Sequence, residues 1–125
     1  MIVLIDSWAW IEYWKGGKYS EAAAKYIEGE DQAIASAINL AEIYHWILRS
    51  YDQKTAERKR ATLEKRCFVI PVDKAIAIEA AKIKKGQGLA LVDSIVLATA
   101  RLSGAKVVTG DEDFKELAEA IFIGG

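Results

Sequence analysis

The sequence has few of the residues that stabilise small secreted domains. It contains one cysteine, Cys67, so no internal disulfide can form. Cys67 stands in the apolar run 67–70, which Pro71, the only proline, closes; a thiol in such a run is expected to be buried and structural rather than nucleophilic. These observations favour a reducing, cytoplasmic environment.

Long hydrophobic runs are also lacking. The first apolar run, 2–5, is interrupted by Asp6 and has no basic leader before it. No later stretch approaches the roughly 20 residues that a membrane-spanning helix needs. We therefore expect neither a signal peptide nor a membrane anchor.

Charge of one sign is not in excess. Seventeen basic and eighteen acidic residues give a formal net charge of −1, so nucleic acid would have to be held by a local basic patch or through metal ions. No glycine-rich turn follows the first apolar run, which excludes a dinucleotide-binding fold. The length, 125 residues, with 52% hydrophobic and 28% charged residues, predicts one globular domain over 1–125.

Apolar runs alternate with helical patterns along the chain. We predict strands at 2–5, 33–36, 67–70 and 106–109, with an edge strand at 120–123. We predict helices at 7–14, 19–28, 39–50, 54–66, 74–84 (capped by Asp73), 90–103 and 112–118. This alternation predicts the α/β class: a three-layer α/β/α fold, with a central parallel sheet of four to five short strands flanked by helices.

Four acidic residues stand where these segments end or turn. Asp6 and Asp111 follow strands, whereas Glu42 and Asp93 belong to helices that can return to the same sheet edge. Ligands bind at that edge in open parallel sheets, near the point where the strand order reverses. If the fold gathers the four acids, they form a site for a hard divalent cation.

Each acid also has a simpler interpretation. Asp93 and Asp111 are typical of helix starts, where capping favours aspartate, and Asp6 could cap the helix that begins at Ser7. Glu42 is harder to explain in this way. Its neighbours are mostly apolar, so an unpaired carboxylate there would be costly unless a cleft, a hydrogen bond or a cation served it.

These motifs resemble those of the PIN-domain nucleases, particularly the VapC-type toxins. The resemblance rests on Asp6-Ser7, on 36–42 with its Asn39 and Glu42, on 91–100 with its Asp93, and on 108–114 with its Thr109, Asp111 and Asp113. It covers nearly the whole chain. Two departures are mild: Ser7 stands where threonine is common, and Ser94 where alanine is common.

The resemblance implies a PIN-like fold and a metal-dependent endoribonuclease that hydrolyses RNA phosphodiester bonds as the toxin of a type II toxin–antitoxin system. The implied partners are an RNA substrate, a cognate antitoxin and a second copy in a homodimer. The implied cofactor is Mg²⁺ or Mn²⁺, as one or two ions. The implied residues are the acidic ligands Asp6, Glu42, Asp93 and Asp111, with Asp113 as a further ligand or an orienting residue, and the supporting Ser7, Asn39 and Thr109.

Two basic segments could hold RNA. The helix 54–66 is rich in lysine and arginine, but Glu57 and Glu64 interleave the bases, which favours a solvated face. Lys84 and Lys85 precede the glycine loop that leads to Asp93, so they are the better candidates. His45, three residues after Glu42, is expected to pack or to form a hydrogen bond rather than to bind metal.

The first helix carries four aromatic residues on more than one of its faces, Trp8, Trp10, Tyr13 and Trp14. At least half of them are expected to pack against the sheet, and the others to reach a surface suited to partner binding or base stacking.

Two other classes of protein are alternatives to a nuclease. A receiver-like, magnesium-binding signalling domain needs an acidic pair at the first strand, an aspartate after the third and a lysine after the last. The sequence has Leu4-Ile5, Ile70-Pro71 and glycines there, so this class fails at three positions. A PIN-like binding module without catalysis is the second alternative, and the intact acids argue against it.

Overall fold

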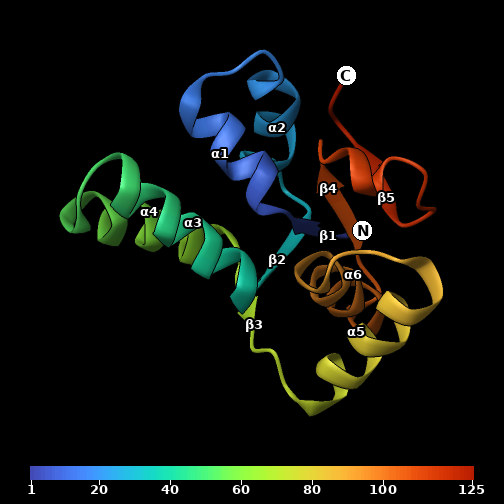
Figure 1. Ribbon diagram of the computed structural model, residues 1–125. Helices are drawn as coiled ribbons and strands as arrows, with labels where there is room; N and C mark the ends of the chain where they lie inside the picture. Colours follow the sequence, from blue (N-terminus) through green and yellow to red (C-terminus); the bar gives the residue numbers. More distant parts are fainter.

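The computed structural model describes residues 1–125 as a five-stranded sheet with helices on both faces (Figure 1). The strands are β1 (Ile2–Ile5), β2 (Gln32–Ser36), β3 (Phe68–Ile70), β4 (Lys106–Thr109) and β5 (Ala120–Phe122). The helices are α1 (Ser7–Lys15), α2 (Ser20–Ile27), α3 (Ala37–Ser50), α4 (Gln53–Arg66), α5 (Lys74–Gln87) and α6 (Leu91–Ser103). A short 3-10 helix, η1 (Glu112–Phe114), follows β4.

All neighbouring strands run parallel, in the order β3-β2-β1-β4-β5. Leu4 of β1 pairs with Ile34 of β2 on one side and with Val107 of β4 on the other. The chain first builds outward from β1 to β3 and then returns to the opposite side of β1. The strand order therefore reverses between β1 and β4, where sheets of this kind bind ligands. The predicted α/β/α fold is confirmed.

Both faces of the central strands are buried, which explains their uninterrupted apolar sequences. Val3 and Ile5 of β1 pack on one face in a core shared with α1, α2, α3 and α4. Leu4 points to the other face, into a second core formed with α5 and α6. Figure 1 shows these two helical layers on either side of the sheet.

Local sequence sets most helix ends. The Asp73 carboxylate accepts a hydrogen bond from the Ile76 amide at 2.9 Å, so Asp73 caps α5 as predicted. Gly104 ends α6 with φ of +65°, a backbone conformation that other residues rarely adopt. Some boundaries differ by a few residues: α5 continues through Gly86 to Gln87, and α3 begins at Ala37 because Ser36 caps it.

The predicted helix 112–118 is wrong. Only Glu112–Phe114 is helical, and as one 3-10 turn. Phe114 is 1% exposed and anchors the segment in the second core. The chain must then reach β4, where Ala120 pairs with Val107, so tertiary packing overrides the local helical preference.

The cysteine and the aromatic residues of α1 lie as the sequence indicates. Cys67 is buried, and burial raises the pKa of its thiol to about 12, consistent with an unreactive residue. Trp10 lies wholly in the first core, whereas Trp8, Tyr13 and Trp14 are partly exposed. No helix is long and apolar enough to cross a membrane.

Candidate metal centre

Asp6 lies at the carboxyl end of β1, at the point where the strand order reverses. It is 6% exposed, and both of its carboxylate oxygens accept hydrogen bonds from neutral donors. Asn39 Nδ2 donates to Oδ1 at 3.0 Å, and Thr109 Oγ1 donates to Oδ2 at 2.8 Å. The side chain is therefore held in one orientation by residues from α3 and β4.

Asn39 performs two tasks with one side chain. Its Oδ1 accepts from the Ser36 amide at 3.0 Å, while Ser36 Oγ accepts from the Ile38 amide at 3.1 Å. The two bonds form a capping box at the start of α3. Because Oδ1 is occupied by the backbone, Nδ2 is directed to Asp6. The capping role of Ser36 was not predicted, although a serine three residues before a residue with a side-chain amide was the available signal.

Ser7 joins Asp6 to Glu42. Its hydroxyl donates to Glu42 Oε1 at 2.7 Å, whereas the distance from Ser7 Oγ to Asp6 Oδ1 is 3.5 Å. Glu42 is exposed, so its carboxylate carries less desolvation cost than its apolar neighbours suggested. Ile43 faces the core, and Glu42 lies on another side of α3. The predicted return of Glu42 toward Asp6 is thus observed, through a hydrogen bond.

Three further acids meet beside this pair. Carboxylate oxygens of Asp93, Asp111 and Asp113 all lie within 4.8 Å of one another. Asp93 comes from the first turn of α6, and the other two come from the turn after β4. Asp113, predicted to be a further ligand or an orienting residue, therefore belongs to the cluster together with Asp93 and Asp111. The structure brings all five acids to the sheet edge that was predicted.

The capping interpretation holds for one acid only. Asp111 Oδ1 accepts from the Asp113 amide at 3.0 Å and caps η1. Asp6 precedes α1 but makes no side-chain cap, and the N-cap of α6 is Ala90 rather than Asp93. Capping therefore accounts for neither Asp6 nor Asp93, although Asp93 lies in the first turn of α6, where the helix dipole favours an acid.

Negative charge at this edge is uncompensated by basic side chains, because none of the five acids forms an ion pair. Burial is the largest cause that raises the pKa of Asp93, to about 7, and the charges of Asp111 and Asp6 raise it further. Burial likewise raises the pKa of Asp6 to about 6, while its hydrogen bond from Thr109 acts in the opposite direction. Carboxylates shifted in this way are typical of functional sites.

The donor set fits a hard divalent cation. It offers only carboxylate oxygens at close range, with no histidine or thiolate in the cluster. Such donors suit Mg²⁺ or Mn²⁺. A bound cation would attract the carboxylates and offset their mutual repulsion. Residues that fix the ligands are also present, since Asn39, Thr109 and Ser7 all hydrogen-bond to Asp6 or Glu42.

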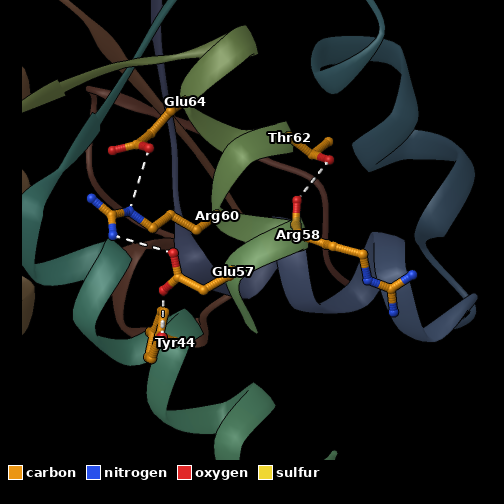
Figure 2. Close-up of polar contacts among 6 residues, drawn as sticks. All are labelled: Tyr44, Glu57, Arg58, Arg60, Thr62 and Glu64. Atoms are coloured by element: carbon orange, nitrogen blue, oxygen red, sulfur yellow. Dashed lines mark hydrogen bonds and ion pairs between the residues drawn. The ribbon is translucent and has the colours of Figure 1, made fainter. Parts of the chain in front are cut away.

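The basic residues of α4 alternate with acids, as the sequence predicts. Arg60 forms ion pairs with Glu57 at 3.6 Å and with Glu64 at 3.4 Å. Figure 2 shows Arg60 between these two acids and the hydrogen bond that Glu57 accepts from Tyr44 of α3. This polar network supports a solvated face that ties α4 to α3. His45 belongs to no acidic cluster, but it is exposed and makes no side-chain hydrogen bond, so the expectation that it packs or hydrogen-bonds is wrong.

Lys84 and Lys85 are exposed in the last turn of α5, just before the loop that leads to Asp93. Neither forms an ion pair. Lys84 Nζ donates to the carbonyl of Leu89 at 3.4 Å, which draws its side chain toward the start of α6.

Comparison with known proteins identifies one family and several solved structures with the same fold. The sequence model of the family described as PIN domain matches residues 3–120. A search of the curated proteins gave no match.

Several solved structures share the fold. A toxin–antitoxin complex from Klebsiella pneumoniae is 21% identical over 95% of both chains, with a TM-score of 0.80. VapC20 from Mycobacterium tuberculosis, described as a sarcin-ricin loop cleaving toxin, is 18% identical over 90% of this chain and 92% of that chain, with a TM-score of 0.75. VapBC2 from Rickettsia felis, bound to a promoter DNA fragment, is 16% identical over 100% of this chain and 99% of that chain, also with a TM-score of 0.75.

Proposed function

The chain belongs to the PIN-domain family, and on that premise we propose that it is a divalent-metal-dependent endoribonuclease, the toxin of a type II toxin–antitoxin pair. The observation that carries this proposal is the convergence of five acids at one sheet edge without a basic side chain to neutralise them. A purely structural role would not favour such a cluster, because like charges at close range destabilise the fold.

Asp6, Asp93 and Asp111 would hold one Mg²⁺ or Mn²⁺ ion directly, with Asp113 as a further ligand and Glu42 closing the site. A second ion would use the same acidic edge. When bound, the cation supplies positive charge that polarises a phosphate and lowers the pKa of water. The number and identity of the ions are part of the proposal.

The chain's own residues would set the geometry of the reaction. Asn39 and Thr109 fix both oxygens of Asp6, so this ligand needs no reorientation when substrate arrives. Ser7 donates to Oε1 of Glu42, and Oε2 accepts no hydrogen bond from the protein. We assign Glu42 the role of orienting the attacking water and accepting its proton.

RNA would approach from the side of α5. Lys84 and Lys85 are free of acidic partners and precede the loop before Asp93, so they suit contacts with phosphates next to the scissile bond. Phosphate contacts of this kind position a substrate without reading its sequence.

Partners of the related structures suggest the biological setting. The Klebsiella pneumoniae structure is a toxin–antitoxin complex, and the Mycobacterium tuberculosis protein is named for cleaving the sarcin-ricin loop. For the present chain we propose an RNA substrate, an inhibitory protein antitoxin and a homodimeric state. Light scattering on the purified protein tests the dimer.

One assay tests the activity. The protein is incubated with a mixed RNA pool in Mg²⁺ or Mn²⁺, and again with excess chelator, beside Asp93→Asn and the matched control Asp73→Asn. Asp73 caps α5, and asparagine caps equally well, so this control keeps the fold and the activity. We expect cleavage by the parent and the control only, and only with metal.

Two results would contradict the proposal. Cleavage that persists in chelator overturns the metal mechanism. A folded parent protein that cuts no RNA in either metal supports the alternative, a PIN-like binding module without catalysis.

A further inference from the structure

Gly110 lies between Thr109, which holds Asp6, and Asp111, which belongs to the acidic cluster. It is buried. The glycines with positive φ are Gly16, Gly88 and Gly104 alone, so backbone conformation does not explain a glycine at position 110. The reason must be the space around it.

That space is filled by Trp8. A methyl group at position 110 would lie 2.3 Å from Cη2 of Trp8 and 2.5 Å from Cζ2 and Cζ3. Carbon atoms in good contact are about 3.5–4.0 Å apart, so the six-membered ring of Trp8 rests directly on the Gly110 backbone. Trp8 follows Asp6 and Ser7 in sequence, and its ring lies 6.1 Å from that of Tyr19.

The chain after β5 contacts the same glycine. A methyl group at Gly124 would lie 2.8 Å from the Gly110 carbonyl oxygen and 3.0 Å from its Cα. The Ile123 amide donates to the Thr109 carbonyl at 2.9 Å and holds the two segments together. Position 110 is thus confined by an aromatic ring and by a neighbouring backbone.

This confined glycine belongs to a turn that carries the centre. The Asp111 amide donates to Thr109 Oγ1 at 3.0 Å, and the same hydroxyl donates to Asp6. The Asp113 amide in turn donates to Asp111 Oδ1. A shift of the turn would therefore move Asp111 and Asp113 together and loosen Asp6.

Repulsion favours such a shift in the absence of a cation. Asp93, on α6, faces Asp111 and Asp113, on the turn, with carboxylate oxygens within 4.8 Å of one another. Separating the turn from α6 would relieve that repulsion. Contact between Trp8 and Gly110 opposes the separation.

We propose that Trp8 is a positioning residue: by resting on Gly110 it holds the turn 109–113 so that Asp111 and Asp113 stand beside Asp93 before a cation binds. The packing role is independent of catalysis, and only its consequence for cation binding rests on the proposed function. An alanine at position 110 would collide with the ring, whereas removal of the ring would make room for it.

A double-mutant cycle of Gly110→Ala and Trp8→Ala tests the proposal on the full chain. The first readout is hydrogen exchange of the Asp111 and Asp113 amides by NMR in chelator, and the second is the Mn²⁺ affinity by calorimetry. We expect Gly110→Ala to speed exchange and to weaken Mn²⁺ binding by about tenfold each. In the Trp8→Ala background, Gly110→Ala should alter the exchange rate and the Mn²⁺ affinity by no more than about twofold each. The effects of substitutions at two contacting residues do not add.

Matched controls separate positioning from general loosening. Gly86→Ala adds a methyl group at an exposed helical glycine with open space, and Trp46→Ala removes a partly buried tryptophan from α3. Neither should change exchange at Asp111 and Asp113. If Gly110→Ala fails to fold, Trp8→Ala against Trp46→Ala decides: faster exchange at the turn in Trp8→Ala alone supports the role, and equal exchange overturns it.

Two outcomes of the cycle overturn the proposal: a folded Gly110→Ala protein with parental exchange and Mn²⁺ affinity, or an equal cost of Gly110→Ala with and without the ring. A parent protein that binds no Mn²⁺ contradicts the proposed function instead. In that case the exchange data, which need no metal, still decide whether Trp8 positions the turn.

Discussion

At the scale of single residues, the acidic centre depends on neutral donors that fix charged acceptors. Thr109 is the clearest example, because its hydroxyl donates to Asp6 at 2.8 Å and accepts from the Asp111 amide at 3.0 Å. It is fully buried, so neither bond can be replaced by bulk water. One hydroxyl group therefore links the end of β1 to the turn after β4.

Replacing Thr109 by valine keeps the shape and removes both hydrogen bonds. We expect a loss of about 1–3 kcal/mol in the free energy of unfolding, the range found when buried polar partners are left unsatisfied. Urea unfolding measures this loss. Thr109→Ser, which keeps the hydroxyl, is the control and should lose less; equal losses for the two variants would show that the methyl group, not the hydroxyl, matters.

The raised pKa values of Asp6, about 6, and Asp93, about 7, predict how stability depends on pH without metal. Both exceed the ordinary value of 3.8, so the folded protein binds these protons more tightly than the unfolded chain does. The resulting stabilisation is fully present below about pH 4 and is lost as pH rises through 6 and 7. We expect the metal-free protein to be less stable at pH 8 than at pH 5, by on the order of 2 kcal/mol, because solvent screening reduces the contribution of the partly exposed Asp93.

Thermal unfolding in chelator between pH 5 and pH 8 measures this dependence. Asp93→Asn removes one of the two titrating groups, so its melting temperature should fall less over the same interval and should exceed that of the parent at pH 8. A parent protein whose stability is constant or rises toward pH 8 would contradict the assigned shifts.

At the scale of elements, helix ends decide where the acids stand. The capping box of Ser36 and Asn39 starts α3 and aims an amide at Asp6. The helix α6 carries Asp93 in its first turn and stops at Gly104. In both helices a local signal fixes the element, and a side chain near its start then serves the centre.

Two glycines provide a matched test of these helix ends. Gly104 has φ of +65° after α6, whereas Gly86 lies within α5 with open space around it and no positive φ. Gly104→Ala should destabilise the protein by about 1 kcal/mol because alanine is strained in that conformation. Gly86→Ala should stabilise it by up to about 1 kcal/mol, because glycine is a poor helix former. Denaturant midpoints compare the two; a shared sign would contradict the assignment of the helix ends.

At the scale of the whole molecule, the centre exists because the strand order reverses between β1 and β4. Asp6 leaves β1, Asp111 follows β4, and α6 returns Asp93 to the same edge. The free energy of folding therefore includes the cost of gathering like charges. A cation bound only by the folded state would offset that cost.

Metal should consequently stabilise the folded protein. At a free Mn²⁺ concentration one hundred times the dissociation constant, we expect an increase of about 2.7 kcal/mol in the free energy of unfolding. Chelator should reverse it. Thermal or chemical unfolding with Mn²⁺ measures the effect, with Ca²⁺-free buffer throughout and Asp93→Asn as the variant expected to lose most of it. Equal stabilisation of Asp93→Asn would place the ion elsewhere.

Much of the fold could be predicted from the sequence because its determinants are local. Apolar runs such as Ile2–Ile5 predict strands that are buried on two faces. Asp73 begins α5 and Gly104 ends α6 through the chemistry of the residues themselves. The prediction for 112–118 is wrong because two tertiary interactions decide the conformation of this segment. Phe114 is buried in the second core, and β5 pairs with β4.

The sequence by itself determined the alternation of strands and helices and the acids that follow them, because hydrophobic period and end signals depend on neighbouring residues. Only the tertiary structure decided that Thr109 bonds to Asp6 across 103 positions, that Glu42 is exposed, that Asp113 joins Asp93, and that Trp8 rests on Gly110. Those features arise from strand order and packing between distant segments, and a one-dimensional pattern does not specify such contacts.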